Sequence, residues 1–455
     1  LFFANLDNGF DAWALDNNEE LVTYSDRPGQ DKQETLGGSI RAELPLSGLG
    51  KLVSITSYSH TDQTYSYDGD WGNDSSYDAF DETDRERTTV AQELRLLNDD
   101  VAGGSAAAGL FYKDLEEKDR RNGYLFKRSG TALNSTFDIT DVAVYGQYSR
   151  SLRPRLSVTL NGRADRYDIA YRGQTVYSDP DTTILIDEQE QAWLLGGKVA
   201  LVYRAASSAS VYGALSRGYR PGGINQHPYL AAINRPFDPE FMTTLEVGGH
   251  WSTARSTTAL TVFHARRSEQ QVSLSQQQVQ DDPLTFFYFT ANASKGSGNG
   301  LELEHRHRPL TNLVLRGTLG LLDTHVDRYP SPTKEDSTLV RGDRAAAHAP
   351  EYNLSLSARY DHPSGLSGRL ELTAADGFFY SDSHDHRSGA HQLLGGSLSY
   401  QRGDWQATLW GRNLLDERYV VRGFFFGNEP PNWTKTLYES YGDPRQWGIS
   451  LSTSI

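Results

Sequence analysis

The sequence predicts an all-β fold, specifically a transmembrane antiparallel up-and-down β-barrel, and three observations lead to this prediction. Apolar and polar residues alternate in segments from one end of the chain to the other, which is the period of a strand with two different faces. Helical periodicity is almost absent, and no run of about 18 apolar residues occurs that would predict a transmembrane helix. The connections between the alternating segments are long and short in turn.

The segment 156–165 illustrates the alternation. Leu156, Val158 and Leu160 fall on one face of the predicted strand, whereas Asn161 and Arg163 fall on the other. Because a barrel strand shows only every second residue to lipid, a hydrophobic content of 37% and a mean hydropathy of -0.59 suit a membrane barrel.

Counting such segments gives about eighteen strands. Many exceed the ~5–6 residues that are usual in soluble sheets and reach the ~9–11 residues that a tilted strand needs to cross a bilayer. The predicted strands are 1–8, 34–46, 51–66, 85–98, 105–120, 137–151, 155–172, 190–204, 209–219, 241–253, 256–275, 292–308, 311–328, 350–362, 365–381, 389–401, 403–421 and 444–455.

The connections orient the predicted barrel. Up-and-down outer-membrane barrels have short periplasmic turns and long extracellular loops, so the long connections are expected outside and the C-terminus at Ile455 in the periplasm. The whole chain, 1–455, is then one barrel domain. The long connections are 9–33, 67–84, 121–136, 173–189, 220–240, 276–291, 329–349, 382–388 and 422–443.

Several classes of function find no support in the sequence. There is no cysteine, and a formal net charge of -15 argues against nucleic acid as a partner. No Gly-rich phosphate loop and no Ser-His-Asp arrangement with a recognisable elbow occurs. The adjacent carboxylates of Asp416 and Glu417 point to opposite faces of a strand and cannot share one substrate atom. We therefore expect neither an enzyme nor a resident cofactor.

Aromatic residues gather near the ends of the predicted strands. Rings with a polar tip prefer the boundary between membrane and water, so these residues are candidate girdles, although Tyr and Trp also favour strands in general. They are Tyr148, Tyr167, Tyr171, Tyr203, Tyr212, Tyr219, Trp251, Tyr360, Tyr400, Trp405 and Trp447.

Several segments, in the expected order over nearly the whole chain, resemble the C-terminal barrels of TonB-dependent outer-membrane receptors. The matching segments are 216–225 (SRGYRPGGIN), 237–240 (FDPE), 244–248 (TLEVG), 298–304 (GNGLELE) and 411–419 (GRNLLDERY), and 11–17 and 67–71 resemble loops of a proteobacterial, siderophore-receptor-like branch. The family barrel has twenty-two strands and an N-terminal plug with a TonB box. We therefore expect an N-terminally truncated chain that lacks the plug and the first strands. Family members usually end in an aromatic residue, whereas this chain ends in Ile455.

The resemblance implies an active importer in the outer membrane of a Gram-negative bacterium. Its loops would capture a scarce nutrient, most often a ferric siderophore, and TonB would supply the energy through the plug. Carbohydrate, cobalamin or another metal chelate are rival substrates, and a passive porin-like barrel is the alternative function. Lipid and lipopolysaccharide of the outer membrane are the further expected partners, and a monomer is the expected state.

Three loops carry the candidate ligand-binding residues. Loop 67–84 is acidic, and we favour a solvated loop over a Ca²⁺ site, with interleaved aromatic rings suited to substrate contact. His384 and His386 have the i, i+2 spacing that places two imidazoles on one side of an extended segment, but without a third ligand a polar loop tip is favoured over a metal site. Loop 422–443 is aromatic, so it is either a binding surface or packed against its neighbours. The candidates are Tyr67, Asp70, Trp71, His384, His386, Phe425, Trp433 and Tyr438.

Two further groups are expected to have structural roles. Arg220 and Asn225 resemble family positions that stabilise the loop 220–240. Charged residues on the lumen-facing side of the predicted strands need partners, and the family resemblance implies that they line the wall against the plug. These are Arg163, Asp165, Arg316, Arg359, Arg369, Glu371 and Arg412.

Overall fold

The structure is a computed structural model, and it describes residues 1–10, 13–16, 21–73, 77–125, 129–178, 181–228, 230–277, 286–331 and 338–453. Its elements are β1 (Phe2–Asp7), β2 (Gln30–Leu46), β3 (Gly50–Asp68), β4 (Ala79–Val101), β5 (Gly104–Leu125), β6 (Ser129–Arg153), β7 (Leu156–Ser178), β8 (Asp181–Ala206), β9 (Ala209–Arg220), β10 (Gly223–Ile224), the 3₁₀ helix η1 (Ala232–Asn234), β11 (Pro236–Phe237), β12 (Glu240–Ser252), β13 (Ser256–Gln277), β14 (Phe286–Leu310), β15 (Leu313–Val326), β16 (Tyr329–Pro330), β17 (Val340–Arg341), β18 (Tyr352–Asp361), β19 (Leu366–Ala375), β20 (His391–Arg402), β21 (Trp405–Arg412), β22 (Val420–Phe426), β23 (Thr436–Tyr441) and β24 (Gln446–Thr453). Within the described residues, no helix has the length and the hydropathy needed to cross a membrane.

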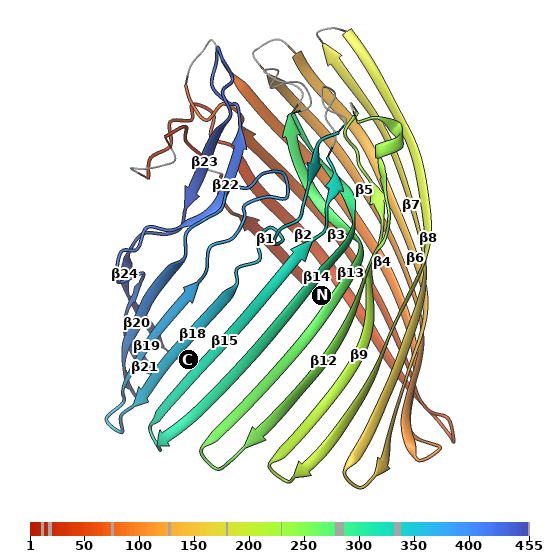
Figure 1. The fold of residues 1–455 in the computed structure, drawn as a ribbon, viewed down its shortest axis with the longest axis vertical. Coiled ribbons are helices and arrows are strands. Elements are labelled where there is room, and N and C mark those ends of the chain that lie inside the picture. The colour runs from red at the N-terminus through yellow and green to blue at the C-terminus, as the bar shows by residue number, and fades with distance from the viewer. Residues whose placement is uncertain are drawn as a thin grey trace.

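Eighteen of these strands form one antiparallel sheet in which each strand pairs with the next along the chain. The sheet curves into the wall of a barrel, with its strands slanted and its short turns together at the bottom of the view in Figure 1. We call the opposite end, where the long connections gather, the loop end. β1 pairs with β2 at one edge and β24 with β21 at the other, and no pairing among the described residues joins these two edges. The all-β antiparallel barrel fold predicted from the alternation is confirmed.

Every strand predicted from the sequence has a counterpart in this sheet, but several boundaries are wrong. The predicted loops 121–136 and 173–189 are largely strand, because β5 and β6 remain paired up to Leu125 and Ser129, and β7 and β8 up to Ser178 and Asp181. These extensions carry no regular apolar alternation, because most of their residues are polar and the apolar Ile184, Leu185 and Ile186 follow one another in β8. The predicted strands 365–381 and 403–421 run too far, since β19 ends at Ala375 and β21 at Arg412. The small strands β10, β11, β16, β17, β22 and β23 within the long loops were not predicted.

The outward face of the sheet is an apolar band with a sharp upper boundary. Leu110, Val144, Leu195 and Leu245 on this face are 54–58% exposed, which suits side chains that meet hydrocarbon rather than water. On successive strands the outward residues then become polar toward the loop end. The first polar positions above the band include Asp114, Arg166, His264, Asn299 and Asp323.

Aromatic side chains frame the lower boundary of this band. Tyr203, Trp251, Tyr360, Tyr400 and Trp405 lie next to the short turns and are 41–64% exposed, which is the placement expected of an interfacial girdle. The prediction is wrong for Tyr171, whose side chain is fully buried. It packs with Ile169, Ile186 and Ile224 on the inner face of the wall.

The loop between β9 and β12 folds against the inner face near the loop end. Leu230 joins a buried cluster with Val272, Leu274, Phe287 and Phe289. Asn225 anchors the loop. Its Nδ2 donates to the carbonyl oxygen of Thr290 (2.8 Å), and the Thr290 N–H donates back to Asn225 Oδ1 (2.7 Å). This contact is structural, as expected for Asn225.

The expected partners of several lumen-facing charges lie two positions away on the same strand, because residues i and i+2 share a face. Arg163 bonds Asp165 (2.6 Å), Arg369 bonds Glu371 (2.7 Å), and Arg359 contacts Asp361 (3.0 Å). Arginine fits this spacing well because its planar guanidinium can reach along the strand to a carboxylate. The wall therefore neutralises these charges locally.

Candidate functional site

At the loop end, the two aromatic loops predicted as ligand-binding pack against each other. The Trp71 ring lies 5.3 Å from that of Trp13 and 5.1 Å from that of Tyr438, between ring centroids, and Phe424 and Phe426 pack around these three buried side chains. We call these five residues the aromatic cluster. It joins the connection after β1, the connection after β3 and the hairpin of β22 and β23. For loop 422–443, the structure therefore shows packing between loops.

A second contact joins the same loops. The Tyr77 ring lies 5.1 Å from that of Trp433, and the Tyr77 hydroxyl donates to Asn428 Oδ1 (2.6 Å). Trp433 is half-buried here. Tyr438, which is fully buried, donates to Glu429 Oε1 (3.0 Å). Trp433 and Tyr438 thus stabilise the packing of the loops at the loop end.

Asp70 is a structural residue of loop 67–84, so the expectation of a solvated loop is wrong for Asp68 and Asp70, which are only 7% and 4% exposed. Asp70 Oδ1 accepts from the Gly72 N–H (2.9 Å) and Oδ2 from the Ala79 N–H (2.8 Å), which closes the loop on itself. Burial raises the pKa of the Asp70 carboxyl to about 6. Asp74 lies outside the described residues.

Three other candidates, His384, His386 and Phe425, meet in one cavity. Both imidazole rings contact the Phe425 ring, with centroid distances of 5.7 and 4.3 Å, and the two imidazoles are 5.4 Å apart. The cavity has a volume of about 360 Å³ and is also lined by Phe286, Phe426, Gln277, Arg341 and Lys435. We call it the mouth cavity, since it lies among the long connections at the loop end.

Arg344 holds the backbone that carries the two histidines. Its guanidinium donates to the carbonyl oxygens of Ser381 (2.6 Å) and His384 (3.1 Å), contacts Asp385 (3.1 Å), and stacks on Phe379. Burial lowers the pKa of His384 to about 4, so this imidazole is neutral at physiological pH. Within the described part of the chain, no three imidazoles or carboxylates are grouped to hold a metal ion.

Two buried donors on residues that line the mouth cavity have no hydrogen-bond partner among the described residues. They are Nε2 of Gln277, a residue only 8% exposed, and Nε of the half-buried Arg341. Leaving a buried donor unpaired costs about 1–3 kcal/mol, so an acceptor that reached these two donors from the cavity would stabilise the lining. Lys435, on the same lining, is exposed and adds a further positive charge.

Sequence reasoning missed Gln277, Arg341, Lys435 and Phe286. They come from three different loops, and no local pattern distinguishes them. The remaining candidate, Tyr67, ends up half-buried near the top of β3, with its ring 5.9 Å from that of Tyr65. It does not line the mouth cavity.

A family model described as "TonB dependent receptor-like, beta-barrel" matches residues 2–414. Three solved structures show the same fold. The ferric yersiniabactin uptake receptor FyuA from Yersinia pestis is 17% identical with a TM-score of 0.78, and the match covers 99% of this chain and 67% of that one. The siderophore receptor PiuA from Acinetobacter baumannii is 13% identical (TM-score 0.71; 99% and 70% covered). The copper transporter OprC is 13% identical (TM-score 0.71; 94% and 68% covered). Family match and fold together place the chain in the TonB-dependent receptors, as a large part of their β-barrel.

Proposed function

We propose that this chain forms the wall and mouth of an outer-membrane importer that captures a ferric siderophore, or a similar metal chelate, and takes its energy from TonB. One observation carries the choice of ligand. Gln277 and Arg341, two residues that line the mouth cavity, each carry a buried donor without a partner, and Lys435 on the same lining adds a positive charge. Siderophores bind iron through oxygen-rich groups, and such a ligand offers acceptors and negative charge to this lining, in which Arg341 and Lys435 outnumber the one carboxylate, that of Asp385.

The aromatic part of the lining supports the same ligand class. Phe286, Phe425 and Phe426 give the cavity an apolar side, and His386 adds an imidazole whose ring lies 4.3 Å from that of Phe425, between ring centroids, at a tilted angle. Ligand sites commonly combine such apolar walls with a few placed polar groups. The relatives named above are called receptors for siderophores and a transporter for copper, so a metal or its chelate is the cargo we favour over carbohydrate or cobalamin.

Growth and uptake under iron limitation test this proposal. Cells with the intact gene should take up ⁵⁵Fe presented as an anionic ferric chelate, and cells without the gene should not. Arg341→Gln should lower uptake about tenfold or more, because it removes a charged donor from the cavity. Arg328→Gln is the matched control. Arg328 is 73% exposed, pairs with Asp343 and does not line the cavity, so uptake should stay unchanged.

Two outcomes would count against the proposal. Unchanged iron uptake without the gene would remove the iron chelate as cargo. Uptake that persists in a strain without TonB would instead support the passive porin-like barrel.

A further inference from the structure

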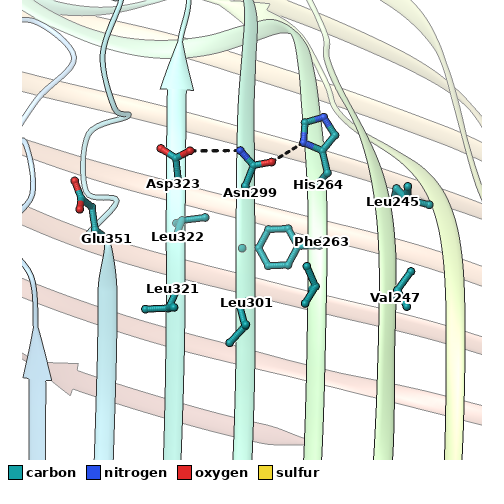
Figure 2. A pocket seen from close by; sticks show the side chains of 12 residues that line it. Leu245, Val247, Phe263, His264, Asn299, Leu301, Leu321, Leu322, Asp323 and Glu351 are labelled. Atoms are coloured by element: carbon teal, nitrogen blue, oxygen red, sulfur yellow. Dashed lines mark hydrogen bonds between the residues drawn. The ribbon is translucent and has the colours of Figure 1, made fainter.

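The two boundaries of the apolar band differ in charge. At the upper boundary, His264, Asn299 and Asp323 lie at one level and are joined by hydrogen bonds, with Leu301 and Leu321 at the next outward position below (Figure 2). The upper boundary thus includes an acidic residue, whereas a long stretch of the lower boundary carries only cations.

These cations come from four short turns that follow one another around the wall. The turns join β6 to β7, β8 to β9, β12 to β13 and β14 to β15, which are consecutive in the sheet (Figure 1). With their flanking residues they are 149–157, 203–210, 251–258 and 305–313, and they contain no Asp or Glu, although the net charge of the chain is -15. We call their seven arginines the basic arc: Arg150, Arg153, Arg155, Arg204, Arg255, Arg306 and Arg308.

All arginines of the basic arc are exposed, and among the described residues none of them has an ion-pair partner. On the next strands along the sheet, by contrast, Arg359 and Arg369 pair with Asp361 and Glu371. Unpaired arginines gathered in one arc produce a local positive potential, which attracts an anionic partner.

Two arginines of the arc lie on the outward face. Arg150 shares a face with the outward Val144, because the register between β6 and β7 is unbroken over this stretch. Arg153 pairs with Leu156, whose partner on β8 is the exposed Tyr203 of the aromatic girdle. These two guanidinium groups therefore lie on the side of the wall that meets lipid.

Tyrosine rings mark the depth of these two arginines. Tyr148 is the outward residue directly above Arg150; its ring lies over Gly104, and its hydroxyl donates to the carbonyl oxygen of Ala102 (3.2 Å). Tyrosine rings prefer the interface between hydrocarbon and headgroups. Arg150, one outward position nearer the turn, is therefore at the level of the headgroups.

The other arginines of the arc add charge from the turns and from the inner side. Arg155 and Arg255 lie in turns, whereas Arg204, Arg306 and Arg308 alternate with outward residues and so begin on the inner side. Their potential still contributes on the outward side, because it decays over a Debye length of about 8 Å at physiological ionic strength.

We propose that the basic arc binds anionic phospholipid in the periplasmic leaflet of the outer membrane. The short turns of outer-membrane barrels lie on the periplasmic side, where the leaflet consists of phospholipids. A phosphate lies against Arg150 and Arg153, and the acyl chains lie along the apolar band above them. Since the arc has no carboxylate to hold an ammonium group, it binds phosphatidylglycerol or cardiolipin in preference to phosphatidylethanolamine. Asp99 and Asp100, at the end of β4, repel such headgroups and limit the site on that side.

Native mass spectrometry of the chain, released from detergent that contains equal amounts of phosphatidylglycerol, cardiolipin and phosphatidylethanolamine, tests the proposal. We expect the two anionic lipids to be retained in preference to phosphatidylethanolamine, and this preference to fall as the ammonium acetate concentration rises, because salt screens the charges. Arg150→Gln and Arg153→Gln should each lower retention of phosphatidylglycerol about fivefold, the effect of one cation near an anionic lipid surface. Arg150→Lys should preserve most of the retention, because it preserves the charge.

Arg402→Gln is the matched control. Arg402 is exposed beside a short turn, that between β20 and β21, but it shares this turn with Asp404, so retention of phosphatidylglycerol should not change. The β-sheet circular dichroism spectrum of each variant verifies folding. Equal retention of phosphatidylglycerol and phosphatidylethanolamine, or an equal loss in Arg402→Gln, would overturn the proposal. An equal loss in Arg150→Lys and Arg150→Gln would also overturn it, because Arg150 would then act through its shape and not through its charge.

Discussion

The aromatic cluster makes a quantitative prediction for Trp71→Ala. Trp71 is 8% exposed, and its ring contacts those of Trp13, Phe426 and Tyr438 at centroid distances of 5.1–5.5 Å. Truncation of a buried aromatic side chain to alanine costs about 3–5 kcal/mol. Loops open locally, without unfolding of the whole barrel, so the lost free energy shifts the equilibrium between closed and open loops. At about 1.4 kcal/mol for each factor of ten, the open population should rise by about 10² to 4 × 10³-fold.

Hydrogen–deuterium exchange followed by mass spectrometry measures this opening. Amides of β23, Thr436–Tyr441, should lose protection in Trp71→Ala, while amides of β6 and β7 in the middle of the wall should keep theirs. Trp447→Ala is the control, because Trp447 is 73% exposed on the outward face and does not belong to the cluster. Unchanged protection of β23 in Trp71→Ala would refute the conclusion that the cluster holds the loops together.

Two further predictions concern the loop end. Because burial in the folded loop raises the pKa of Asp70 from its ordinary value of 3.8 to about 6, the folded loop binds the proton more tightly than the open loop. Closure of loop 67–84 should therefore be strongest below about pH 4 and weaken as the pH rises to about 6. Exchange of the Ala79 amide between pH 4 and 7, corrected for intrinsic rates, should reveal this, and a flat profile would contradict it. Asn225→Ala removes hydrogen bonds between loop 220–240 and β14, so we expect a loss of about 1–3 kcal/mol in local stability. Faster amide exchange at Thr290, with unchanged exchange in β6, would confirm that Asn225 anchors the loop. Unchanged exchange at Thr290 would show that the contact of Asn225 is dispensable.

The sequence was sufficient to predict the wall because the wall obeys a local rule. Each strand needs one apolar and one polar face, and Leu156, Val158 and Leu160 reveal this within five residues. The same rule failed where both faces are polar, as in β5 beyond Glu116. There the register still pairs Arg120 with Asp84 and Asn134, but residues 117–123 include no apolar side chain that would mark the strand.

The mouth cavity follows no such rule, so only part of it was predictable. The spacing of His384 and His386 correctly indicated that the two imidazoles lie close together, since they are near neighbours in the chain. Gln277 and Arg341 are 64 positions apart, and their convergence depends on how three loops fold over one another. What identifies them is a property of the folded state alone, an unpaired donor in a buried place.

Residues at the loop end thus divide into two groups with different expected effects on transport. Trp71 and Tyr438 are packed against other loops, so their loss should disturb the mouth indirectly by raising the open population of the loops. Arg341 faces the cavity, so its loss should weaken ligand binding without opening the loops. Exchange protection of β23 together with chelate affinity separates the two cases. Trp71→Ala should change both, whereas Arg341→Gln should change affinity alone. If the amides of β23 also lost protection in Arg341→Gln, the unpaired donor of Arg341 would be part of the loop packing. The main observation that supports a ligand in the mouth cavity would then be lost.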